Sequence, residues 1–200
     1  MARPVNTKKR VELLSKLVAH VGMNGLYGQS ITTIGTAVDT SPRMLIHYFG
    51  SIAKLRLEVM KAVSERFREM LRELPSAVTE SPTRYVLTIA NQLASPEYRR
   101  VMSAFFELYG ISVNDPEGHA DFASRSVESY LIEFRKVTAG WGVPEASRDK
   151  VVTLMLGLGR GLSADMVATG DIQRVVATAN WFAEILEREV CRERANASDY

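Results

Sequence analysis

The stretch that decides the fold is SITTIGTAVDTSPRMLIHYFGS, residues 30–51. Ser30 can cap one short helix, and Pro42 suits the first turn of a second one. Two short helices joined by a turn of about three or four residues are typical of a helix-turn-helix, whose second helix can enter the major groove of DNA. In that second helix Leu45 and Phe49 are four residues apart, so they are predicted to face the core.

The other side chains of the second helix are suited to contact with DNA. Arginine can read guanine with two hydrogen bonds, methionine can touch a thymine methyl, and histidine and tyrosine can donate to phosphates or base edges. The outward-pointing residues are Pro42, Arg43, Met44, His47 and Tyr48. The alternative is a helical hairpin inside a bundle, but a bundle helix would not choose arginine, histidine and tyrosine beside so many apolar residues.

Helical periodicity continues along almost the whole chain, and no alternating segment predicts a strand. A serine or aspartate precedes a proline at three places, so helices are predicted to begin near residues 82, 96 and 116. One further helix is expected before the turn at Gly170 and one after it. The predicted fold is therefore all-α, with an N-terminal three-helix domain and a C-terminal helical bundle.

Charge is unevenly placed along the chain. The net charge is only +2, but residues 1–62 contain nine Lys or Arg against three Asp or Glu. Such a basic quarter is expected where only that part meets a polyanion, although an ordinary solvated surface accounts for it equally well. No apolar run approaches the roughly 18 residues of a membrane span. The lone cysteine, Cys191, agrees with a reducing compartment, so we expect a cytoplasmic protein without a membrane partner.

Residues 25–32 read GLYGQSIT, small residues stand at Gly35 and Ala37, and residues 47–51 read HYFGS. Through these motifs, residues 8–60 resemble the TetR family of transcriptional regulators. This resemblance implies a helix-turn-helix whose third helix reads an operator, a helical ligand-binding body, and dimerisation through the last two helices. The implied DNA-binding domain is 1–50, and the ligand-binding and dimerisation domain is 51–200, with helix four starting at 51.

The chain departs from the family pattern at three positions. Asp39 stands where the turn usually has glycine, Ile46 where tyrosine is frequent, and Ile52 where lysine is usual. Aspartate tolerates a left-handed backbone, so the turn should survive. In the family that lysine contacts a phosphate, so another basic residue would have to make this contact here. Arg56 is one candidate, beside the basic residues in the predicted set below. The predicted DNA-contacting residues are Lys8, Lys9, Arg10, Thr32, Thr33, Ser41, Pro42, Arg43, Met44, His47, Tyr48 and Lys54.

Large rings gather in the middle of the chain, where the resemblance implies a pocket. Core packing is the ordinary role of such residues, but rings and methionines lining a pocket would accept a small, mostly apolar effector. The predicted effector-binding residues are Met102, Phe105, Phe106, Tyr109, Phe122, Tyr130, Phe134 and Met155, with His119 as a further polar candidate.

The last two helices carry apolar faces that no later element of the chain can cover. We therefore predict a homodimer whose interface contains Leu158, Leu162, Met166, Phe182, Leu186 and Val190. The small residues Gly157 and Gly161 are expected to allow close packing of helix backbones.

Other patterns do not predict chemistry. Asp115, Glu117, His119 and Asp121 alternate, so they diverge on a helix and do not form a metal site. No serine, cysteine or histidine spacing marks a nucleophile, and neither an enzyme nor a cofactor is expected. The predicted function is sequence-specific DNA binding by a homodimeric transcriptional regulator, a repressor released by its ligand. The alternative is a helical small-molecule-binding or scaffold protein that does not contact DNA.

Overall fold

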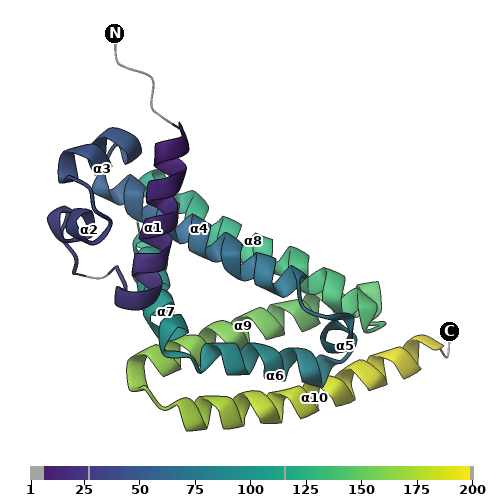
Figure 1. Ribbon diagram of the computed structural model, residues 1–200. Coiled ribbons are helices and arrows are strands. Elements are labelled where there is room, and N and C mark those ends of the chain that lie inside the picture. Colours follow the sequence, from purple (N-terminus) through teal and green to yellow (C-terminus); the bar gives the residue numbers. More distant parts are fainter. Residues whose placement is uncertain (1–6, 27, 115, 199–200) are drawn as a thin grey trace. The chain divides into compact units, whose positions relative to one another are not determined.

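A computed structural model describes residues 7–26, 28–114 and 116–198 of the chain, and these residues form ten helices and no strand (Figure 1). The all-α prediction is confirmed. The helices are α1 Thr7–Asn24, α2 Ile31–Ala37, α3 Pro42–Phe49, α4 Ile52–Arg72, α5 Ser76–Thr79, α6 Pro82–Leu93, α7 Pro96–Asn114, α8 Pro116–Gly140, α9 Glu145–Thr169 and α10 Ile172–Ser198.

Local capping explains where several helices begin. α6, α7 and α8 begin at the three prolines that the sequence indicated. The hydroxyls of Ser81 and Ser95 accept hydrogen bonds from the backbone N–H groups of Arg84 and Tyr98, at 3.2 and 3.1 Å. Such caps satisfy N–H groups that have no partner within the helix. The short α5, which directly follows Pro75, was not predicted.

The chain divides into two compact units, and each contains segments that are distant in sequence. The first unit takes in the chain up to Arg66 together with Arg100–Ala123, and the second takes in Phe67–Arg99 and the chain from Ser124 onward. α4, α7 and α8 therefore contribute to both units. The unit that contains the helix-turn-helix is larger than the predicted domain of residues 1–50.

The core of the first unit holds α2 and α3 against α1. Its buried apolar side chains come from α1 to α4 and from α7 and α8. Full burial of one such side chain is worth about 1.5–3 kcal/mol. The most deeply buried members include Leu13, Leu17, Val21, Ile34, Leu45, Leu55 and Val59.

The core of the second unit lies among the end of α4, α6, α8, α9 and α10. α6 packs along α10, and α9 also contacts α10 (Figure 1). Trp141 is buried, its ring centroid lies 5.6 Å from that of Tyr85, and its indole N–H donates to the carbonyl of Thr79 at 2.6 Å. This bond fastens the loop after α8 to α5.

α9 contains a longer apolar stretch than the sequence analysis predicts. It contains an 18-residue window of mean hydropathy 1.4, which by length and composition could cross a membrane, and 28% of that window is buried. One such helix is weak support for a membrane span, because core helices of soluble proteins pass the same test. α9 supplies Val152, Met155, Ser163 and Met166 to the interior of the second unit, as expected of a partly buried core helix.

Candidate nucleic-acid interface

The turn between α2 and α3 is held by a close backbone approach. The N–H of Thr40 donates to the carbonyl of Gly35 at 2.9 Å. A Cβ atom at Gly35 would lie only 2.7 Å from the carbonyl oxygen of Thr40, so this position requires glycine. Asp39 has a φ of 55°, the left-handed conformation that the resemblance implied for this position.

Serine caps fix the start of both helices. Ser30 accepts from the N–H of Thr33 at 3.1 Å, and Ser41 accepts from the N–H of Met44 at 3.2 Å. Pro42 occupies the first turn of α3, where its missing N–H costs nothing. Both helices of the motif are therefore fixed by local hydrogen bonds as well as by the core.

α3 has one buried side and one exposed side. Leu45 is fully buried and Phe49 is 3% exposed, as predicted. Arg43 and His47 are exposed, whereas Tyr48 is half-buried, with its ring centroid 5.1 Å from that of His47. Within the described part of the chain, the Arg43 side chain makes no ion pair or hydrogen bond. Its guanidinium is therefore free to bind an external partner.

Two apolar side chains flank Arg43 and His47 on the exposed part of α3. Met44 is 38% exposed and Ile46 is 41% exposed. Ile46 departs from the family pattern and is not among the predicted contact residues. Its position three residues after Arg43 could have identified it, because residues three apart are neighbours on a helix surface.

Arg10 has an internal role in the first unit. Its guanidinium forms an ion pair with Glu58 and donates to the carbonyl of Tyr48 at 3.3 Å. It also lies 5.4 Å from the centre of the Phe49 ring. These contacts tie α1 to the end of α3, so Arg10 positions α3. A contact of Arg10 with phosphate stays a prediction.

Arg56 is also held internally. It donates to the carbonyl of Gln29 at 3.1 Å and lies 3.7 Å from the carboxylate of Glu107. It therefore links α7 to the loop before α2 and is a poor substitute for the lysine missing at position 52.

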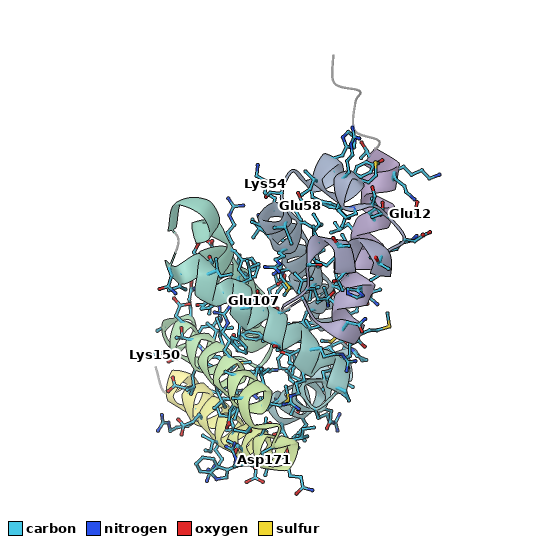
Figure 2. All side chains as sticks on the ribbon, turned by 90° about the vertical axis from the view of Figure 1, so that its left-hand side faces the viewer. Glu12, Lys54, Glu58, Glu107, Lys150 and Asp171 are labelled. Carbon is cyan, nitrogen blue, oxygen red and sulfur yellow. The ribbon has the colours of Figure 1, made fainter. Side chains whose placement is uncertain are left out.

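The other predicted contact residues on this side are accessible. Lys8, Thr32, Thr33 and Ser41 are exposed, and Lys54 projects from the start of α4 (Figure 2). Lys9 is paired with Glu12 at 3.0 Å, on α1. Lys8 and Lys54 are thus better placed than Arg10 to meet a phosphate.

The eight predicted effector-binding residues are divided between the two units. Phe105 packs against Phe106, Tyr109 and Phe122 in the first unit, with ring centroids 5.5 to 5.7 Å apart. Met102 also packs in that unit. Tyr130, Phe134 and Met155 lie in the second unit. The first five residues therefore belong to the core that supports the helix-turn-helix.

An apolar pocket of about 80 Å³ lies within the second unit. Of the predicted effector residues, only Phe134 and Met155 line it. Three predicted interface residues also line it, namely Leu158, Leu162 and Phe182. These three side chains are half-buried at the pocket, and their role in a dimer stays a prediction.

The remaining predicted interface residues are buried in their own chain. Met166 is 1% exposed, Leu186 3% and Val190 2%. These three side chains are covered within the second unit, where α10 packs against α6 and also contacts α9. This covering could not be read from either helix alone. Gly157 and Gly161 are exposed, and a Cβ atom on either would meet nothing within 4 Å. Close packing of helix backbones at these glycines was expected in the dimer interface, and it stays a prediction.

No group of three or more metal-ligating side chains occurs among the described residues. The side chains of Asp115, Glu117, His119 and Asp121 lie outside the described set.

No family model matches the chain, and no curated protein matches its sequence. Solved structures do match its fold. A transcriptional regulator from Rhodococcus sp. RHA1 has a TM-score of 0.71 and 13% identity, covering 90% of this chain and 96% of that one. A TetR-like transcriptional regulator from Rhodococcus sp. RHA1 has a TM-score of 0.59 and 18% identity, covering 96% of this chain and 99% of that one. NalD, the secondary repressor of the MexAB-OprM multidrug efflux pump in Pseudomonas aeruginosa, has a TM-score of 0.56 and 16% identity, covering 94% of this chain and 96% of that one.

The chain therefore has the fold of TetR-type transcriptional regulators, as the resemblance of residues 8–60 implied. These structural neighbours are regulators and not enzymes.

Proposed function

We propose that this protein is a cytoplasmic, sequence-specific DNA-binding repressor that acts as a homodimer and is released from DNA by a small apolar molecule. The observation that carries the proposal is the exposed side of α3, with Arg43, Met44, Ile46 and His47 on a helix whose other side is locked into a core. The repressor role is supported by the fold of NalD, itself a repressor.

The chemistry of this exposed side fits base edges. Arg43 can donate two hydrogen bonds to guanine, and Met44 and Ile46 can pack on thymine methyls. Lys8 and Lys54 supply charge for sequence-independent phosphate contacts. Ser41, Thr32 and Thr33 add hydroxyls at the starts of the two helices, where backbone N–H groups also favour phosphate.

A second subunit is needed because one short helix reads too few base pairs. Two recognition helices must lie about 34–36 Å apart, or a multiple of that distance, to enter successive major grooves. α9 and α10 are the best candidates for the interface. They carry exposed apolar groups that their own chain leaves uncovered, with Leu154 56% exposed and Trp181 64% exposed.

The exposed row on α9 has helical spacing. It consists of Leu154, Gly157, Gly161, Ala164 and Ala168, which are spaced three or four residues apart. We name these residues the α9 row. Small residues let a second helix approach closely, and Leu154 and Trp181 supply apolar area.

Arg174 fastens α9 to α10 by binding Asp165 with two hydrogen bonds of 2.5 and 2.7 Å, and this contact lowers the pKa of Asp165.

A DNA mobility-shift assay with the promoter beside the protein's own gene, titrated with salt, tests the proposal. The shift should weaken with salt, because binding releases counterions from the phosphates. Arg43→Ala should cost about 1–3 kcal/mol on the specific site and little on random DNA. Lys54→Ala is the matched control, since it should weaken binding to both DNAs alike and flatten the salt slope by about one unit.

Equal losses on both DNAs for Arg43→Ala would assign that residue to phosphate. Absence of any salt-dependent shift, also on mixed genomic fragments, would favour a helical ligand-binding or scaffold protein that does not contact DNA.

A further inference from the structure

The pocket in the second unit differs from the surrounding core because it is left unfilled. Protein interiors usually leave few voids larger than a water molecule. Here α6, α8, α9 and α10 meet around a partly open space of about 80 Å³. An apolar cavity of about 150 Å³ takes one benzene. This space can therefore hold part of one ring, with the rest of a ligand lying at the open side.

The lining of the pocket restricts the charge of an occupant. None of the residues that line it carries a charged side chain. Phe134 and Phe182 supply ring faces and edges, and Met155 supplies an adaptable thioether. An ion here would lose its hydration without gaining a counter-charge, whereas a neutral apolar molecule has no charge to desolvate.

Tyr85 carries the one hydroxyl of the lining. It is 1% exposed, and its hydroxyl oxygen has no hydrogen-bond partner among the described residues. Burial raises the pKa of this phenol, so it stays protonated and keeps its proton to donate. An occupant with one acceptor atom could satisfy this hydroxyl.

We propose that this pocket binds a compact, neutral aromatic molecule with a single hydrogen-bond acceptor, held by Phe134, Met155 and Phe182 and by the hydroxyl of Tyr85. The proposal rests on the proposed function in one respect, namely that this molecule is the effector of the repressor. The same helix connects the two roles, because Leu158 and Leu162 face the pocket while Gly157 and Gly161 lie in the α9 row.

Binding can be measured without DNA by NMR of ¹³C-methyl methionine. Met155 is the reporter in the pocket, and Met23, which is 63% exposed in the first unit, is the internal reference. The probes are benzyl alcohol, toluene and benzoate, which share one ring. Benzyl alcohol should shift the Met155 signal saturably and leave Met23 unmoved, and benzoate should bind at least tenfold more weakly. Equal or tighter binding of benzoate, or no shift at Met155, would overturn the proposal.

Two variants locate the site. A Cβ atom at Gly159 meets nothing within 4 Å and this residue lines the pocket, so Gly159→Leu should fill it and abolish the shift. Gly110→Leu, the same change in α7 where a Cβ atom also meets nothing within 4 Å, should leave it intact. Tyr85→Phe should weaken benzyl alcohol several-fold and leave toluene unchanged. Retained binding in Gly159→Leu, or equal effects of Tyr85→Phe on both probes, would contradict the assignment.

A separate mobility-shift arm tests the effector role. Benzyl alcohol should reduce operator binding by the unmodified protein and not by Gly159→Leu. If the NMR shift is present but operator binding is unaffected, the pocket stands and the effector role is wrong. If the protein does not bind DNA at all, the NMR result still decides the pocket.

Discussion

α3 and α9 both leave one side uncovered by their own chain, but the uncovered sides differ in chemistry. The uncovered side of α3 carries arginine and histidine beside two apolar residues, and the uncovered side of α9 carries leucine, glycine and alanine. A polyanion with distinct base edges suits the first surface, whereas another apolar helix suits the second. The composition of an exposed helix face thus indicates the kind of partner better than its exposure does.

The largest effect is expected where the α9 row would lose its partner. Leu154→Glu combined with Trp181→Glu should place like charges in the proposed interface and yield a monomer by light scattering. A monomer engages one half-site, so it should lose about half of the roughly 4–10 kcal/mol that separates specific from non-specific binding. Ile132→Glu is the control, because Ile132 is 45% exposed on α8. A double variant that stays dimeric would remove this face from consideration.

The next effect concerns the turn that makes α3 usable. Gly35→Ala would place a methyl against the Thr40 carbonyl, and such overpacking typically costs about 1–3 kcal/mol of stability. Operator binding should fall with it. Gly110→Ala is matched, since its methyl has open space in a helix and should gain up to about 1 kcal/mol. Urea denaturation of both variants measures the difference, and equal stabilities would show that the turn relaxes freely.

A smaller effect should separate the apolar from the polar contacts of α3. Replacing single operator thymines by uracil removes only the methyl group, which is worth about 0.8 kcal/mol when buried. The unmodified protein should lose this amount at the thymines touched by Met44 or Ile46. Met44→Ala and Ile46→Ala should each become insensitive at one position. Insensitivity of the unmodified protein at every thymine would assign these side chains to another partner.

The smallest effect is expected at Asp39. A left-handed conformation costs a non-glycine residue about 1–2 kcal/mol, and glycine loses about 0.5–1 kcal/mol through its greater freedom in the unfolded chain. Asp39→Gly should therefore stabilise the protein by about 0.5 kcal/mol in urea denaturation. Asp39→Ala, which keeps the side-chain cost without the short polar group, should destabilise it instead.

The same contrast explains what the sequence could predict. The caps at Ser41 and Ser81 and the side of α3 that Leu45 and Phe49 bury are local properties, so spacing was sufficient to find them. Which element covers an apolar helix face depends on the rest of the fold, so it is not a local property. Leu186 and Val190 are predicted interface residues, yet they are buried in their own unit, whereas Trp181 on the same helix is 64% exposed. A single amphipathic helix does not specify which partner covers it.

The interleaving of the two units also affects how the protein can be made. Phe105, Leu108 and Phe122 belong to the core around α1 to α3, but they follow the first strip of the second unit in the chain. A ribosome adds about 5–20 residues per second, so the first unit cannot close its core until several seconds after α3 has emerged. A fragment that ends near residue 66 would expose that core to water, and the helix-turn-helix is therefore not a detachable module.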